Sequence, residues 1–366
     1  MRHDDAPFGA PPRAIGFSRR AALPAVALAV ALLCGLQPWA GARALSLQSD
    51  DLRAGLDRPA RPVPARAAYG DKLSDPFFFG GPRRGAGDLV PAVPSGMVPL
   101  RADSAEALRA ALRDRGYRLA AIRAGRAAVP RLGLAALPRD IGSIDDVRLR
   151  KSLFLRSVLP LVLMVNEELR ELRRELQSAI ALEAGPGGLS PRRRAWLVDL
   201  ATRYGVDYGD WAALLRRVDA VPVSLALAQA AQESGWGRSR FARNGNALFG
   251  QRTWNDTVPG LVPLRRDEDA DHRVRAFPDL LSAVRTYMHN LNTHPAYDAF
   301  RRARAATRAR GAAPDPLRLA ETLTHYAELG EGYIDAVCAL IRVNRLREFD
   351  GARLAYPDGA KLADLD

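Results

Sequence analysis

Apolar residues recur with helical spacing from Ile144 almost to the end of the chain. Apolar positions three and four residues apart form one face of a helix, so this pattern predicts a mainly helical domain over residues 145–350. Helices are expected over residues 147–184, 190–204, 210–218, 222–235, 280–292, 296–309, 316–327 and 333–347. Pro160 lies inside the first of them and is expected to kink or divide it.

The segment after residue 235 has a different pattern. Two or three short extended pieces are predicted there, around residues 248–254, 260–264 and 273–277, because Gly, Pro and Asp residues separate them. A small β element is therefore inserted between the helix at 222–235 and the helix that follows. The fold class expected is mainly α, with an α+β arrangement.

Residues 45–140 alternate Pro, Gly, Ala and Arg with little periodicity. This composition predicts a largely disordered spacer, with one short helix from Ser104 to Tyr117 in which Ser104 caps the first turn.

Residues 1–44 have the pattern of an export signal. Arg19 and Arg20 precede an uncharged run from Ala21 to Leu36, and Ala42-Arg43-Ala44 offers a cleavage site of small residues. The run is short for a membrane-spanning helix, so cleavage near Ala44 is favoured over anchoring. The mature protein is expected in the periplasm or the cell envelope.

The chain carries 54 Lys and Arg against 41 Asp and Glu, a net charge of +13. Such an excess suggests a polyanionic partner, and the export signal points to anionic envelope surfaces rather than nucleic acid. The alternative is that Arg simply accompanies an Ala-, Gly- and Pro-rich composition. Cys338 is the only cysteine after residue 44, and the five histidines lack metal-ligand spacing, so no disulfide, metal or cofactor is expected.

The strongest candidate for chemistry is Glu233, in the run Ala230–Gly237. It falls in the last turn of the helix that opens at Pro222 and closes at Gly235, on the same face as Gln229. The negative end of the helix dipole and the neighbouring Trp236 both favour a protonated carboxyl, which is the state that a general acid requires. Glutamates near helix ends are often merely solvated, so the residues that follow decide between the two interpretations.

Those residues resemble a known family. Glu233-Ser234-Gly235-Trp236-Gly237, an Asn-rich turn and Leu248-Phe249-Gly250 are similar to the bacterial glucosaminidase (endo-β-N-acetylglucosaminidase) family, which includes flagellar peptidoglycan hydrolases. The likeness extends over residues 145–350 and includes Leu153–Arg156, Leu189–Pro191, Arg217–Asp219 and Asn290–Tyr297. It implies a lysozyme-like fold, in which a helical lobe and a small antiparallel β-lobe flank a glycan groove.

The resemblance also implies an activity. The expected reaction is hydrolysis of the β-1,4 bond after N-acetylglucosamine in peptidoglycan strands, with Glu233 as the general acid. A second carboxylate would come from Asp267, Glu268, Asp269 or Asp271, and Glu268 is our choice, although the substrate's own acetamido group can replace it.

Tyr326 resembles the Tyr of a C-terminal Tyr-Ala-Thr-Asp motif and is placed with the catalytic groups, although Glu328-Leu329 stands where Thr-Asp is expected. The residues implied to bind substrate are Trp236, Asn246, Phe249, Gly250, Tyr287 and Tyr333. A core position is the alternative for Tyr326, Tyr287 and Tyr333. Two other functions stay open, namely a lytic transglycosylase and a non-catalytic glycan-binding or scaffold protein.

Overall fold

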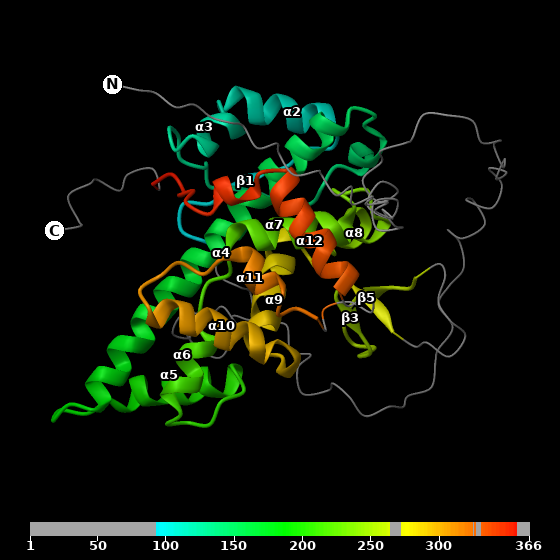
Figure 1. Cartoon of the computed structure of the whole chain (residues 1–366). Coiled ribbons are helices and arrows are strands. Elements are labelled where there is room, and N and C mark those ends of the chain that lie inside the picture. The colour runs from blue at the N-terminus through cyan, green and yellow to red at the C-terminus, as the bar shows by residue number, and fades with distance from the viewer. Residues whose placement is uncertain (1–92, 264–271, 325, 327–330, 357–366) are drawn as a thin grey trace, which may run out of the picture. The chain divides into compact units, whose positions relative to one another are not determined.

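Helix α4 (Val147–Glu183) is the central element of the computed structural model, which describes residues 93–263, 272–324, 326 and 331–356 (Figure 1). The Asp146 side chain caps it by accepting from the backbone N–H groups of Arg148 and Leu149. Residues 157–166 are buried all round, as expected of a helix that crosses a core. The helix continues through Pro160, so the predicted division there is wrong, because burial on every side offsets the hydrogen bond that proline cannot make.

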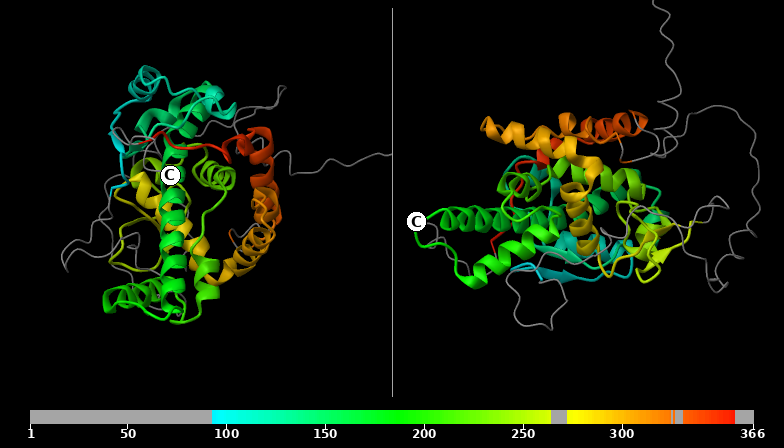
Figure 2. Two further views of the ribbon diagram at one scale, coloured as in Figure 1. Left: turned by 90° about the vertical axis from the view of Figure 1, so that its left-hand side faces the viewer. Right: turned by 90° about the horizontal axis from the view of Figure 1, so that it is seen from below.

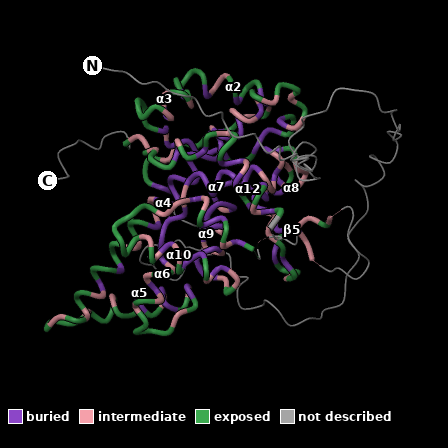
Figure 3. The backbone as a smooth tube through the Cα atoms, viewed as in Figure 1, coloured by how far each residue is buried: buried purple, intermediate pink, exposed green. Residues whose placement is uncertain are grey.

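The second half of α4 forms a smaller core with α5 (Pro191–Arg203) and α6 (Trp211–Arg217). Ser190 caps α5 and Pro191 occupies its first turn, as predicted. Fully or almost fully buried residues from the three helices and the adjoining turns meet here: Leu176, Ala179, Leu197, Leu200, Ala201, Tyr204, Leu214 and Val218. This end of the helical domain carries many exposed residues, whereas buried ones gather around α7, α9 and α12 (Figure 3).

Helix α7 (Val223–Ser234) lies between α4, α12 and η4, and almost all of it is buried. The other elements of the C-terminal half are α8 (Arg240–Gly245), α9 (Leu280–Thr293), η3 (Pro295–Tyr297), α10 (Asp298–Ala309), α11 (Pro316–Ala320), α12 (Glu331–Val343) and η4 (Leu346–Phe349). Further views of their arrangement are given in Figure 2. Helix α11 ends earlier than predicted, in a turn where the Thr322 hydroxyl donates to the Leu319 carbonyl at 2.6 Å.

A three-stranded antiparallel sheet follows α8. Its strands are β3 (Arg252–Thr253), β4 (Gly260–Leu261) and β5 (Arg273–Arg275), in the order β3-β5-β4. Val274 of the central strand pairs with Arg252 on one side and Leu261 on the other. The predicted fold class, mainly helical with a small antiparallel β-lobe as in lysozyme-like proteins, is confirmed.

Residues 93–143 differ from the prediction. They form β1 (Val98–Leu100), α2 (Ala105–Asp114), α3 (Leu119–Arg123), β2 (Leu132–Leu134) and η2 (Arg139–Ser143), with β1 and β2 paired in parallel. The short helix capped by Ser104 is confirmed. A disordered spacer up to residue 140 is wrong for this part, because Leu108, Leu112 and Ile141 are buried against the rest of the domain.

Long-range polar contacts hold this segment in place. Arg131 makes two hydrogen bonds to the Glu167 carboxylate of α4, at 2.7 and 2.8 Å, and a third to the carbonyl of Ala355 at 2.7 Å. Arg123 binds Glu348 at 2.8 Å. Such partners lie tens to hundreds of positions away and leave no local periodicity in the sequence. The predicted signal peptide and residues 45–92 lie outside the described residues.

The helices described by the structure are not suited to cross a membrane, since none combines sufficient length with an apolar surface.

Candidate active site

Helix α7 carries Glu233 and is fixed at both ends. At its start, Pro222 offers no side-chain cap, and Asp350 takes that role by accepting from the Ser224 backbone N–H and hydroxyl, both at 2.8 Å. At its end, the Ser234 hydroxyl donates to the Ala230 carbonyl at 2.6 Å and accepts from the Gly237 N–H at 3.0 Å. The position of Glu233 along the helix is therefore well defined.

The turn after Glu233 has three successive residues with positive φ. Gly235, Trp236 and Gly237 have φ of 57°, 59° and 83°. Gly235 is the left-handed C-cap predicted from the sequence, and this conformation is costly for Trp236, which has a Cβ. Burial offsets that cost, because the Trp236 ring packs edge-on against Phe154 with centroids 5.7 Å apart.

Glu233 sits in a close-fitting, largely buried site. A Cβ built on Gly250 would lie 2.9 Å from Oε2 of Glu233, and Gly250 has a φ of 62°, so only glycine suits this position. The Tyr333 hydroxyl of α12 forms a hydrogen bond with the Glu233 carboxyl. Burial raises the pKa of Glu233 to about 7, against the opposing effects of the Tyr333 hydrogen bond and the positive charge of Arg252.

Five aromatic rings from different parts of the chain form a cluster at this carboxyl. Tyr326 stacks on Tyr333 with centroids 5.3 Å apart, and it contacts Tyr297 at 5.9 Å and Tyr287 at 6.5 Å. Phe249 stacks on Tyr287 at 3.8 Å. Burial raises the pKa of all four tyrosines of the cluster, and the negative charge of Glu233 adds to this increase.

Gln229 joins this cluster to the helix. Its side-chain oxygen accepts from the Tyr287 hydroxyl at 2.7 Å, and its nitrogen donates to the Tyr333 oxygen at 3.0 Å. Three helices, α7, α9 and α12, are thus connected by hydrogen bonds within one turn of Glu233.

Comparisons with known proteins match the part of the chain that carries this site. The family model of glucosaminidases, described as mannosyl-glycoprotein endo-beta-N-acetylglucosaminidase, matches residues 209–346, which hold α7, the β-lobe and the tyrosine cluster. Protein bax of Escherichia coli (strain K12) is 34% identical over 205 residues, which cover 54% of this chain and 70% of the relative. The chain belongs to the glucosaminidase family. No solved structure matches it significantly.

Membership of the glucosaminidase family makes the chain a glycosidase-type enzyme with a glycan substrate. The domain brings together five of the predicted site residues around Glu233, namely Phe249, Gly250, Tyr287, Tyr326 and Tyr333. Glu268 and the neighbouring acidic candidates lie outside the described residues.

Trp236 and Asn246 occupy structural positions in this glucosaminidase domain. Trp236 is 3% exposed, with Phe154 at its edge and the Lys151 ammonium 4.8 Å above its ring, so a sugar has no access to it. Asn246 is the left-handed C-cap of α8 and donates to the Phe277 carbonyl at 3.0 Å. Its side-chain oxygen is buried without a hydrogen-bond partner among the described residues. The buried Trp236 ring gives no support to its predicted substrate contact, and the substrate contact of Asn246 stays a prediction.

Phe249 and Tyr287 are 2% and 1% exposed, so their rings belong to the core beside Glu233, and their predicted contact with substrate stays a prediction. Tyr333 is also buried and acts on the carboxyl directly, whereas Tyr326 is half-buried, and its hydroxyl lies 3.4 Å from the Phe249 carbonyl. The sequence interpretation did not assign Tyr297, Arg252 or Gln229 to the site. A signal existed for Gln229, since it lies one helical turn before Glu233 in an otherwise apolar stretch.

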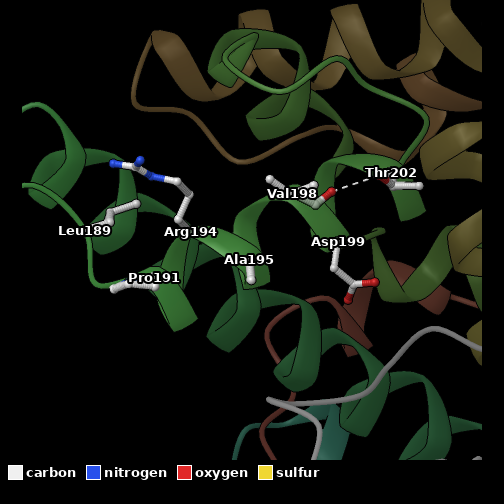
Figure 4. A pocket seen from close by; sticks show the side chains of 7 residues that line it. All are labelled: Leu189, Pro191, Arg194, Ala195, Val198, Asp199 and Thr202. Carbon is white, nitrogen blue, oxygen red and sulfur yellow. Dashed lines mark hydrogen bonds between the residues drawn. The ribbon is translucent and has the colours of Figure 1, made fainter. Parts of the chain in front are cut away.

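A pocket along α5 is lined by residues that do not belong to the site around Glu233 (Figure 4). It is lined by Leu189, Pro191, Arg194, Ala195, Val198, Asp199 and Thr202. Its one carboxylate, Asp199, is paired with Arg203 at 2.9 Å, so the pocket lacks a group suited to acid catalysis. Within the described ranges, no cluster of His, Cys, Asp and Glu is arranged to hold a metal ion.

Proposed function

We propose that this chain is a peptidoglycan hydrolase, an endo-β-N-acetylglucosaminidase that cleaves the β-1,4 bond after N-acetylglucosamine with Glu233 as the general acid. One observation supports this most strongly. Glu233 lies at the end of a buried helix, and the pKa of its carboxyl is raised to about 7. It therefore holds a proton near neutral pH.

The surroundings of Glu233 suit both halves of a proton transfer. The protonated carboxyl donates to the glycosidic oxygen as the bond to the sugar breaks. The carboxylate left behind accepts a charge-assisted hydrogen bond from Tyr333 and is attracted by Arg252. Both interactions are stronger with the anion than with the neutral acid, so they favour the transfer.

Two groups are candidates for completing the reaction. A carboxylate from residues 267–271, of which Glu268 is our choice, would activate water or stabilise the positive charge at the sugar. Otherwise the substrate's own acetamido oxygen attacks the anomeric carbon, and Tyr326 orients that group. We further propose that the protein acts in the periplasm or cell envelope, where peptidoglycan lies. Association with anionic envelope surfaces stays a prediction.

The test is product analysis on purified peptidoglycan with the parent chain and Glu233→Gln. The parent should release glycans with new reducing N-acetylglucosamine ends, identified by mass spectrometry, and the variant should lose at least about a hundredfold in rate. Glu171→Gln, at an exposed site on α4, is a matched control that should keep full activity. Equal rates for the parent and the Glu233 variant would refute the role of Glu233.

The same experiment separates the alternatives. Anhydromuramic acid ends would identify a lytic transglycosylase, which also uses a buried glutamate as an acid. Tight binding to sacculi without any product after long incubation would identify a glycan-binding protein.

A further inference from the structure

Gln229 is a polar side chain one helical turn before Glu233, and none of its surface is exposed. Most of the residues around it on α7 are Ala and Leu. An amide in such a place is costly unless both of its ends are hydrogen-bonded, and here they are, through Tyr287 and Tyr333. Each end of the Gln229 amide thus has a hydrogen-bond partner.

The direction of the hydrogen bonds follows from the chemistry of the amide. The Gln229 oxygen can only accept, so the Tyr287 hydroxyl must donate to it. The Gln229 nitrogen can only donate, so the Tyr333 oxygen must accept. The Tyr333 proton is then free to point to the Glu233 carboxyl, its other hydrogen-bond partner. The three donors therefore form one chain, from Tyr287 to Gln229, from Gln229 to Tyr333 and from Tyr333 to Glu233.

We infer that Gln229 is a positioning residue that fixes the Tyr333 hydroxyl as a donor to Glu233, with Tyr287 holding the amide in the required orientation. This inference rests on the proposed role of Glu233 as the acid. The Tyr333 oxygen already accepts a hydrogen bond from Gln229. When Glu233 is protonated, its carboxyl proton therefore does not have to be donated to Tyr333 and can be donated to the glycosidic oxygen. After the transfer, the Tyr333 hydrogen bond becomes charge-assisted.

The other groups that face Glu233 cannot replace Tyr333 in this role. Tyr287 of α9, Tyr297 of η3 and Tyr326 stay neutral near pH 7, because burial raises the pKa of Tyr297 to about 12 and those of the other two well above the usual range. The positive charge of Arg252 of β3 lowers the pKa of Glu233, but no hydrogen bond described here connects Arg252 to Gln229. Among the described residues, Tyr333 is thus the group through which Gln229 can change the pKa of Glu233.

Two variants interrupt the network at different points. Gln229→Met keeps a similar volume but no longer fixes the direction of the Tyr333 hydroxyl. Tyr287→Phe leaves Gln229 in place but frees its amide to rotate and to accept the Tyr333 proton itself. Both should raise the pKa of Glu233, since the Tyr333 hydrogen bond lowers it. The expected shift is about one pH unit for Gln229→Met and about half of that for Tyr287→Phe.

The shift is measured by carbon NMR titration of glutamate carboxyls in the full chain, with the Glu233 signal assigned by its loss in Glu233→Gln. The pH dependence of kcat on peptidoglycan is measured in parallel. We expect its high-pH limb to move upward with the NMR midpoint, while kcat falls and KM changes little, because Gln229 is buried and does not reach the substrate.

Asn292→Leu is the control for loss of a buried amide elsewhere. Asn292 is fully buried in α9 and bonded to the Asp219 carbonyl at 2.9 Å and to Arg304 at 2.8 Å, so its loss should reduce stability but leave the Glu233 midpoint unchanged. An unchanged midpoint near pH 7 in both network variants would overturn the role of Gln229 and leave Glu233 as the acid. A parent midpoint near 4.5 would instead overturn the raised pKa on which both proposals rest. If Gln229→Met does not fold, Tyr287→Phe decides.

Discussion

Replacing Glu233 with Gln should make the protein more stable at alkaline pH and leave its stability unchanged in acid. The pKa of Glu233 is raised from 4.5 to about 7 in the folded chain. Above pH 7 the folded protein must therefore hold a carboxylate in a site that favours the neutral acid, whereas the unfolded chain ionises freely. An amide carries no charge and removes this penalty.

The magnitude follows from the difference between the two pKa values. One pKa unit corresponds to about 1.4 kcal/mol, so a shift from 4.5 to about 7 gives a destabilisation of about 3 kcal/mol in the parent at pH 8. The sign is fixed by the direction of the shift. Protonated Glu233 makes its full favourable contribution to the unfolding free energy below pH 4.5, and this contribution is lost as pH rises through 7. The difference in unfolding free energy between Glu233→Gln and the parent therefore grows over that pH range.

Urea unfolding of the parent, Glu233→Gln and Glu171→Gln at several pH values from 4 to 8 measures this difference. The gain in unfolding free energy of Glu233→Gln over the parent should rise with pH and then level off, and Glu171→Gln should show no comparable rise. A gain that is the same at pH 4 and pH 8 would refute the burial argument for Glu233, whatever the enzymatic activity of the variant.

Three further predictions concern the site and its support. First, the rate of glycan cleavage should fall about tenfold per pH unit above pH 7, as the acid loses its proton, and this limb should be absent from the pH dependence of substrate binding. Second, Gly250→Ala should lower kcat at least about tenfold, because the added Cβ would displace the Glu233 carboxyl. Gly116→Ala is its control, since Gly116 has the same φ of 62° and open space where the Cβ would lie. It should lower the unfolding free energy by only about 1 kcal/mol. Third, Asp219→Ala should lower the unfolding free energy, measured by urea unfolding, by about 3–5 kcal/mol. The reason is that the substitution leaves the fully buried Arg304 without its carboxylate partner. A loss below about 1 kcal/mol would contradict this.

Local patterns in the sequence were sufficient for most helices of the domain. The caps at Ser190, Pro191 and Gly235 and the apolar spacing around them predict α5 and α7, because these signals act within one turn. The predicted division of α4 at Pro160 was wrong, because the burial that keeps this helix continuous depends on residues distant in sequence. Residues 93–143 were missed for the same reason, because their order depends on contacts with α4 and with residues near position 350.

The site was predictable in part. Glu233 and Gly250 stand out in a short motif, and the structure places them in contact. The orientation of the aromatic residues was not predictable, because a sequence does not show which side of Trp236 or Phe249 meets the core. Gln229 has an evident place in the helical repeat, but its importance appears only when Tyr287 and Tyr333, from two other helices, lie at its two ends.

The contacts between the first and last described segments have a consequence for how the protein is made. Arg123 reaches Asn344 and Glu348, and Val129 forms a bridge with Leu354, so positions more than 200 residues apart close the domain together. A chain that emerges from its N-terminus first cannot form these contacts until its last segment has followed. The contacts of α3 with η4 are therefore missing until these residues are made, and a fragment that stops before residue 344 should aggregate or be degraded. Synthesis of residues 344–354 is thus expected to be the step that closes this part of the domain.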